Sequence, residues 1–102
     1  MKFSLCIGAY PGKDEIWHLE KVKELGFHGL EYYAWWELPD LRRTAREQER
    51  IGVGICAVCT RFISLVDETF REAYITGLRE TIEACKFLNV GSIISQTGNV
   101  LP

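Results

Sequence analysis

The segment Leu25-Gly26-Phe27-His28-Gly29-Leu30-Glu31-Tyr32 decides the fold, because it ends one regular pattern and begins another. Leu25 closes a helical pattern, and Gly26 is the residue type that best tolerates the left-handed conformation just past a helix end. A short apolar run follows. The same joint recurs at Ile51-Gly52-Val53, before Ile55-Cys56-Ala57, and at Leu88-Asn89-Val90, before Ile93-Ile94-Ser95. Three copies of helix end, tight turn and buried strand predict a chain of repeated βα units.

The segments before these joints have helical spacing and predict helices over 14–25, 39–51 and 67–88. Asp14 and Asp67 are suited to N-caps, and Pro39 is acceptable in a first turn. The second helix has a weak apolar face. The apolar stripe of the first helix is Ile16, Leu19, Val22 and Leu25, and that of the third is Phe70, Tyr74, Leu78, Ile82, Cys85 and Leu88.

Four short runs rich in Ile, Val, Leu and Tyr predict strands at 2–8, 29–34, 54–60 and 92–97. Since no hairpin turn joins them, strands alternating with helices imply an α/β class with parallel pairing and right-handed crossovers. A doubly wound sheet is the alternative. However, Gly8-Ala9-Tyr10-Pro11-Gly12 after the first strand is neither G-x-G-x-x-G nor a P-loop. We therefore predict the N-terminal half of a TIM (βα)8 barrel, with residues 1–102 forming a single partial domain.

Bulk composition limits the classes of function. The chain has 102 residues, whereas an ordinary TIM barrel has roughly 250. Its formal charge of −2 lacks the basic footprint expected for nucleic-acid binding, so no nucleic-acid partner is expected. The sequence contains neither an apolar run of about 18 residues, which a membrane span needs, nor a signal peptide. We expect no membrane association, a cytoplasmic location, and four cysteines that are reduced and buried.

Several segments together resemble the sugar phosphate isomerase/epimerase family, the xylose-isomerase-like barrels that include hydroxypyruvate isomerase and ketose 3-epimerases. The resemblance extends along the whole chain, and its most specific part is the entry to the second strand. The matching segments are Met1-Lys2-Phe3-Ser4, Glu24-Leu25-Gly26-Phe27-His28-Gly29-Leu30-Glu31, Ile55-Cys56-Ala57-Val58-Cys59 and Ser95-Gln96-Thr97-Gly98.

This resemblance implies a metal-dependent isomerisation or epimerisation of a small ketose, aldose or hydroxypyruvate-like substrate. In such enzymes a divalent metal (Mn, Mg, Co or Zn) polarises the hydroxy-carbonyl pair and carboxylates move the proton. The family's metal ligands come largely from the fifth to eighth strands, and this sequence ends at Pro102, before them. We therefore expect no catalytic or metal-ligating residue in this chain, and no activity from the chain alone.

Two candidate substrate-binding groups come from the second strand and its carboxyl end, where TIM barrels bind ligands. Leu30 and Tyr32 are expected to face the helices, which places Glu31 on the barrel interior. Glu31 is either a substrate-contacting group or a structurally paired charge. Trp35, together with Tyr33 and Trp36, either lines a sugar pocket or packs the loop after the second strand against the second helix.

Arg61 and Gln96 are the candidates at the ends of the third and fourth strands. Arg61 can clamp a carboxylate or phosphate, or pair with Asp67 or Glu68 in its own loop. Gln96 can bond to a substrate hydroxyl, or be a polar residue at the rim.

The remaining polar residues predict no site. His18 lies within the first helix and His28 at the opposite end of the barrel, so both are expected to be structural or exposed. Endonucleases of the same superfamily place metal-binding histidines at strand ends, where this chain has none. Cys56-Ala57-Val58-Cys59 has the CxxC spacing, but residues three apart in a strand face opposite sides, which does not suit a redox or zinc site.

A half barrel has two open sheet edges and an uncovered interior face, which favour association. We expect self-association or docking with a second half-barrel. A non-catalytic assembly module is therefore the alternative to an enzyme fragment.

Overall fold

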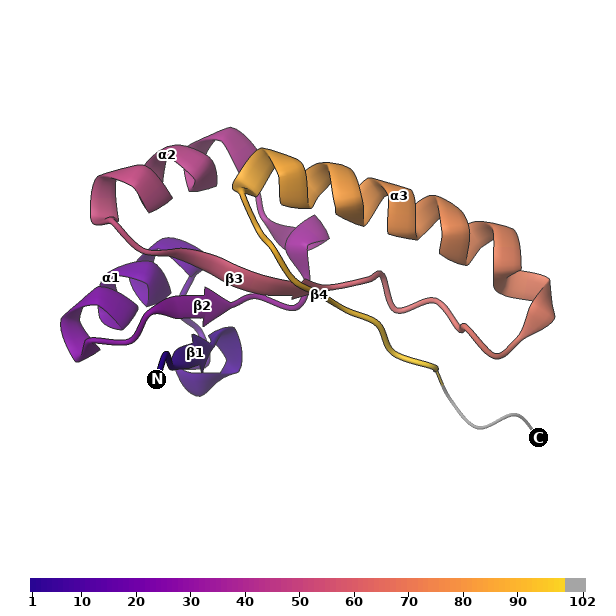
Figure 1. The fold of residues 1–102 in the computed structure, drawn as a ribbon, viewed down its shortest axis with the longest axis horizontal. Coiled ribbons are helices and arrows are strands. Elements are labelled where there is room, and N and C mark those ends of the chain that lie inside the picture. Colours follow the sequence, from indigo (N-terminus) through magenta and orange to yellow (C-terminus); the bar gives the residue numbers. More distant parts are fainter. Residues whose placement is uncertain (99–102) are drawn as a thin grey trace.

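The computed structural model describes residues 1–98 and contains a four-stranded, all-parallel sheet in the order β1-β2-β3-β4 (Figure 1). Strands and helices alternate along the chain, so the predicted α/β class and parallel order are confirmed. The elements are β1 (Ser4–Cys6), η1 (Ile7–Ala9), α1 (Glu15–Leu25), β2 (Gly29–Glu31), η2 (Trp35–Glu37), α2 (Leu41–Ile51), β3 (Gly54–Cys59), η3 (Glu68–Phe70), α3 (Arg71–Leu88) and β4 (Ile93–Ile94). Pro102 lies outside the described residues.

All three repeated joints end their helices as the sequence predicts. Gly26, Gly52 and Asn89 follow α1, α2 and α3 in the left-handed conformation, with φ of 76°, 83° and 57°. The backbone N–H of Gly26 donates to carbonyl groups of the last turn of α1, which satisfies helix-end acceptors. The joints therefore fix where each strand begins.

The helix beginnings differ in part from the prediction. Asp14 caps α1 by accepting a bond from the N–H of Trp17, as expected. The cap of α2, however, is Asp40, so Pro39 lies outside the helix. Asp67 caps the short helix η3 instead of α3, which begins at Arg71.

The hydrophobic core lies between the sheet and the three helices. Leu19, Leu30 and Leu88 are fully or almost fully buried in it. Three residues of the predicted stripes are exposed: Leu25 at the end of the first stripe, and Phe70 and Ile82 in the third. Three-residue steps turn by about 60° around a helix and four-residue steps by about 40° the other way, so each stripe leaves the buried face within a few steps.

The buried row of α3 includes Cys85 and Leu88, as predicted, but its other members are small residues, which is why the apolar pattern missed them. Its buried members are Gly77, Thr81, Ala84, Cys85 and Leu88. A Cβ atom at Gly77 would lie 3.4 Å from Ile63 Cδ1 and 3.5 Å from Arg61 Cδ, so the absence of a side chain lets the chain after β3 lie close to α3. Figure 1 shows this chain running alongside α3, beyond the end of the strands.

The strands are shorter than predicted, including β2, which pairs on both sides, while β1 and β4 each pair on one side only within residues 1–98. β4 has two paired residues, and both Ile93 and Ile94 are partly exposed. In the part of the chain that the structure describes, no helix is long and apolar enough to cross a membrane.

Candidate functional site

The carboxyl ends of the four strands meet at one end of the sheet, toward the side of Figure 1 where the chain ends. Four segments follow these ends: 7–13 after β1, 32–37 after β2, 60–66 after β3 and 95–98 after β4. TIM barrels bind their ligands at this end of the sheet. Glu31, Trp35, Arg61 and Gln96 all lie in or beside these segments, and the structure shows which of them come together.

Glu31 ends β2 on the sheet face that the helices leave uncovered. Its register partners are Cys6 in β1 and Ala57 in β3, whereas Leu30 is fully buried on the opposite face. The expected inward direction of Glu31 is therefore confirmed, and its side chain is half-buried. Burial raises the pKa of the nearby Cys59 thiol, and the charge of Glu31 raises it further.

A β-bulge corrects the prediction for the CxxC pair. Leu30 pairs with Ile55, but Glu31 pairs with Ala57, so Cys56 is an extra residue in β3. A Cβ atom at Gly29 would lie 2.9 Å from the Cβ of Cys56, which puts Cys56 on the face of Gly29 and Glu31. Cys59 is on the same face, since it lies two residues after Ala57, the register partner of Glu31. The two thiols thus share the inner face instead of facing opposite sides.

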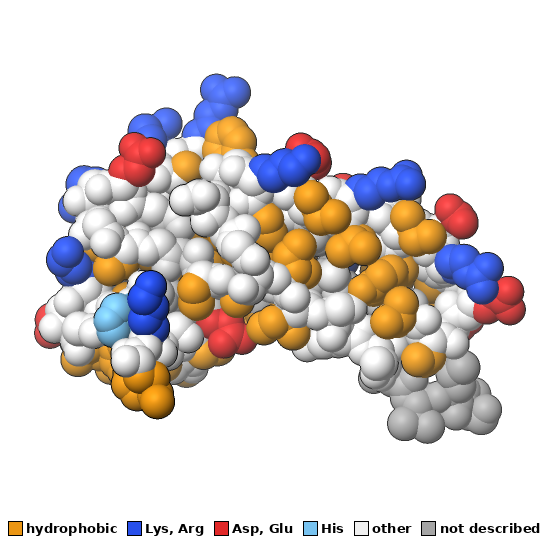
Figure 2. All heavy atoms as spheres, in the orientation of Figure 1, with side chains coloured by type: hydrophobic (Ala, Val, Ile, Leu, Met, Phe, Trp, Pro, Cys, Tyr) orange, Lys and Arg blue, Asp and Glu red, His pale blue; other side chains and the backbone are white. Residues whose placement is uncertain are grey.

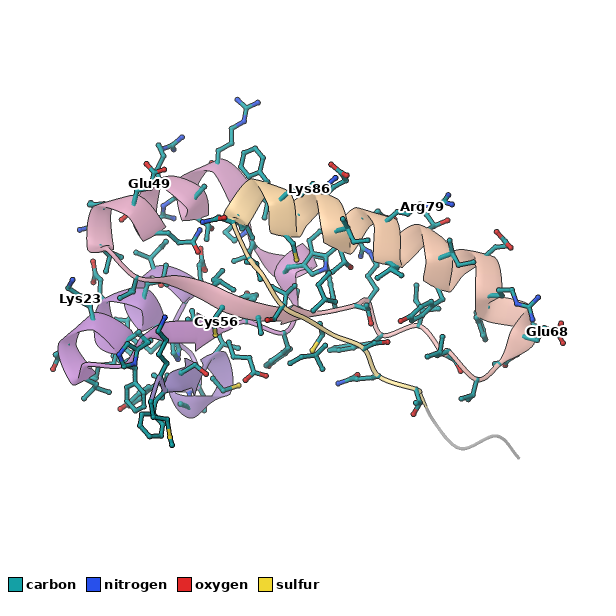
Figure 3. All side chains as sticks on the ribbon, in the orientation of Figure 1. Lys23, Glu49, Cys56, Glu68, Arg79 and Lys86 are labelled. Carbon is teal, nitrogen blue, oxygen red and sulfur yellow. The ribbon has the colours of Figure 1, made fainter. Side chains whose placement is uncertain are left out.

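The cysteines also differ in exposure, which corrects the expectation that all four are buried. Cys59 and Cys85 are buried, whereas Cys6 and Cys56 are exposed (Figure 3 labels Cys56). The inner face therefore presents thiols and a carboxylate. No group of three or more His, Cys, Asp or Glu side chains in residues 1–98 is arranged to hold a metal ion.

Trp35 is buried in the core, so it packs as one of its two predicted roles requires, but its hydrogen-bond partner is on α3 and not on the second helix as expected. Its side chain is 8% exposed, and its indole N–H donates to the hydroxyl of Thr81 on α3 at 3.0 Å. A substrate role for Trp35 stays a prediction.

Arg61 lies over the rings of Trp35 and Trp36, with its guanidinium carbon 5.0 and 5.6 Å from their centroids. It also pairs with Glu80 of α3 at 2.9 Å. The expected pairing with Asp67 or Glu68 is wrong: Asp67 accepts bonds from Thr69, and Glu68 pairs with Arg71. The guanidinium is thus held by an aromatic face and a carboxylate of its own chain.

An exposed aromatic surface adjoins Arg61. The Phe62 ring is stacked on Tyr33 at 6.4 Å and meets Trp36 edge-on at 5.0 Å. Tyr33 and Phe62 are 40% and 60% exposed. We call Tyr33, Trp36 and Phe62 the aromatic surface. Figure 2 shows hydrophobic side chains gathered below α3, while charged side chains line the outer side of α3. The sequence reasoning missed Phe62, although an aromatic residue just after a strand end is a usable signal.

Gln96 is exposed and shares a hollow with Phe62. The hollow has a volume of about 320 Å³ and is lined by Phe62, Ile63, Ser64, Asp67, Phe70, Gln96 and Gly98. The structure therefore brings Gln96 to the aromatic surface, while Glu31 lies on the inner face of the sheet.

The two histidines have structural contacts, as predicted. His28 accepts a hydrogen bond from the backbone N–H of Phe3 at 3.2 Å, at the amino end of the strands. His18 is fully buried in α1, where its Nδ1 atom bonds to the carbonyl oxygen of Asp14 at 2.8 Å.

The sheet order, the helix ends and the inward Glu31 define the first half of a TIM barrel. Solved structures support this fold. The chain is similar to the 3-keto-D-glucoside 4-epimerase of E. coli, with a TM-score of 0.77 and 17% identity over 91% of this chain and 36% of that one. It is also similar to an AP endonuclease of family 2 from Brucella melitensis, with a TM-score of 0.83 and 11% identity over 96% and 42% of the two chains.

A third similar structure is a fusion of a xylose isomerase-like TIM barrel with a 4-hydroxyphenylpyruvate dioxygenase, with a TM-score of 0.74 and 14% identity. That match covers 93% of this chain and 16% of the fusion protein. At these identities the likeness establishes the fold alone, that of half a TIM barrel. The chain spans less than half the length of each of these proteins. No protein-family model matches it, and no curated protein does.

Proposed function

We propose that this chain is the N-terminal, substrate-contacting part of a sugar isomerase or epimerase. The aromatic surface is the observation that supports this most directly, because aromatic rings stack on the C–H faces of sugars. It lies at the carboxyl ends of the strands, where barrel enzymes bind their substrates. The epimerase among the similar structures supports the same assignment.

Arg61 favours a sugar over a hydroxypyruvate-like substrate. Binding a carboxylate through Arg61 requires breaking its ion pair with Glu80 and leaving that glutamate unpaired. An uncharged ketose or aldose needs no such exchange. The unpaired thiols support a reducing compartment such as the cytoplasm.

The divalent metal of such a reaction needs more ligands than residues 1–98 assemble, since Glu31 is the sole inward carboxylate at the strand ends. We propose that the metal and the proton-transfer groups come from strands that follow this half. Accordingly, the 102-residue chain is expected not to convert hydroxypyruvate or ketoses when Mn2+ or Mg2+ is added.

Sugar binding to the aromatic surface tests the proposal without requiring turnover. Addition of D-fructose is expected to shift the side-chain NMR signals of Trp36 and Tyr33 saturably, and Phe62→Ala to abolish this response. Phe87→Ala is the matched control, because Phe87 is 50% exposed but lies at the far end of α3. The proposal fails if no saturable shift occurs, or if the two variants respond alike.

Assembly is the second candidate function, and the open sheet supports it. β1 and β4 have one paired edge each in the described chain, and Phe3, Ile93 and Ile94 are exposed near those edges. Unpaired strand edges recruit further strands. We propose that a second copy or a separate second half covers them. Sedimentation should then show association as concentration rises, whereas a monomer with cooperative melting at high concentration would refute this.

A further inference from the structure

A second cavity lies at the same end of the sheet, between the 7–13 loop after β1 and the segment after β2, and shares only Tyr33 with the aromatic surface. Its volume is about 380 Å³, within the range of small-molecule sites. The side chains that matter for binding are Tyr10, Lys13, Tyr32, Tyr33 and Glu37. Tyr32 belongs to the face of the sheet that the helices cover, opposite Glu31, so this cavity is separate from the inner face.

The lining supplies both kinds of hydrogen-bonding group that a sugar hydroxyl needs. Burial raises the pKa of Tyr32 to about 12, and the charges of Glu15 and Glu37 add to the shift. A phenol is protonated at neutral pH and can donate, and the shift keeps the Tyr32 phenol protonated well into the alkaline range. Glu37 is exposed at the cavity and its carboxylate accepts. Lys13 adds a further donor.

Aromatic rings and a glycine complete the shape. Tyr10 meets Trp17 edge-on at 5.0 Å, which holds its ring beside the cavity. Tyr33 is stacked between Tyr32 and Phe62, at 6.5 and 6.4 Å, and so lies between this cavity and the aromatic surface. Gly12 has a φ of 84°, and a Cβ atom at this position would meet nothing within 4 Å, so the 7–13 loop is uncrowded where Gly12 lines the cavity.

Local charge selects against anions. Three carboxylates, those of Glu15, Glu37 and Asp14, lie near enough to the Tyr32 phenol to raise its pKa. Two lysines oppose them: the ammonium group of Lys13 lies over the Trp17 ring, 5.3 Å from its centroid, and that of Lys21 lies 5.9 Å from the centroid of the Tyr10 ring. A phosphate or carboxylate would be repelled by this surplus of negative charge, whereas an uncharged polyol would not.

We propose that this cavity is a second carbohydrate-binding site, in which Tyr32, Glu37 and Tyr10 bind an uncharged sugar ring. The site does not depend on the isomerase or epimerase reaction, and it has its own residues apart from Tyr33. It would bind a sugar unit beside the one on the aromatic surface.

NMR titration of the 102-residue chain tests this site separately. Methyl β-D-glucopyranoside is expected to shift the amide signals of Gly8, Gly12 and Ala34 saturably, and glucose 6-phosphate to bind more weakly. Glu37→Gln and Tyr32→Phe should each weaken binding about tenfold, since the first replaces a charged acceptor by a weaker neutral one and the second removes a donor. Glu72→Gln, an exposed glutamate on α3, is the matched control and should bind as the wild type does.

Phe62→Ala separates this proposal from the proposed function. It should abolish the response of Trp36 to fructose and leave the glucoside-induced shift of Gly12 unchanged. The second site is refuted if no saturable shift appears at the three amides, if glucose 6-phosphate binds as tightly as the glucoside, or if Glu37→Gln binds like Glu72→Gln.

Discussion

The indole nitrogen of Trp35 donates a 3.0 Å hydrogen bond to the hydroxyl of Thr81, across 46 residues of sequence. This bond joins the segment after β2 to the middle of α3. Both side chains are buried, and the same hydroxyl donates to the carbonyl of Gly77 at 2.8 Å. The contact therefore holds α3 against the end of the sheet that carries the aromatic surface.

Replacing Thr81 by Val should lower the free energy of unfolding by about 1–3 kcal/mol, because a buried N–H loses its acceptor while the side-chain volume hardly changes. Urea unfolding measures the loss, and the indole proton signal of Trp35 should move. Thr44→Val is the control: Thr44 is equally buried, but its hydroxyl donates only within α2, to the carbonyl of Asp40. Equal losses in the two variants would show that the bond to Trp35 contributes nothing.

The left-handed helix ends give a second prediction. Gly26→Ala should destabilise the protein by about 1–2 kcal/mol, because a side chain raises the energy of the left-handed conformation. Gly26→Asn should cost less, since Asn89 already occupies the same position after α3. Gly91→Ala is the control, because Gly91 has no positive φ and open space around it. Thermal unfolding ranks the three variants, and a Gly91→Ala loss as large as that of Gly26→Ala would contradict the prediction.

The helix ends and the inward direction of Glu31 could be predicted because they depend on local conformation and on simple alternation along a strand. The extra residue Cys56 could not, since a bulge is defined only by pairing with a neighbouring strand. The ion pair of Arg61 with Glu80 was missed for a related reason: helix η3 intervenes, so the sequence does not show which turn of α3 faces the arginine. The cavity beside Tyr32 was also missed, because it is formed by two loops that the sheet brings together.

Thiol reactivity tests the inner face. Cys6 and Cys56 are exposed, whereas Cys59 and Cys85 are buried, and burial raises the pKa of both buried thiols. A disulfide reagent such as DTNB should therefore modify two thiols rapidly at neutral pH and the other two only on unfolding. Cys6→Ser and Cys56→Ser should each remove one rapid phase. Four rapid thiols would contradict the burial of Cys59 and Cys85.

The same reagent reports on assembly. If a second half covers the inner face, the rapid reactions of Cys6 and Cys56 should slow as protein concentration rises, while those of the buried thiols stay unchanged. Reaction rates that are independent of concentration would contradict covering of this face.

Tyr32 predicts how stability depends on alkaline pH. Its pKa is about 12 in the folded protein and about 10 in the unfolded chain. Between these values the unfolded chain has lost the phenolic proton and the folded protein retains it, so raising the pH favours unfolding. At pH 11 the contribution of Tyr32 to the free energy of unfolding should have fallen by about 1.4 kcal/mol.

Urea unfolding at pH 9 and pH 11 measures this loss. The free energy of unfolding should fall by about 1.4 kcal/mol more in the wild type than in Tyr32→Phe, which has no phenolic proton to lose. Tyr74→Phe is the control, because the structure gives Tyr74 no comparable burial. Equal losses in all three proteins would mean that the cavity does not protect the phenol.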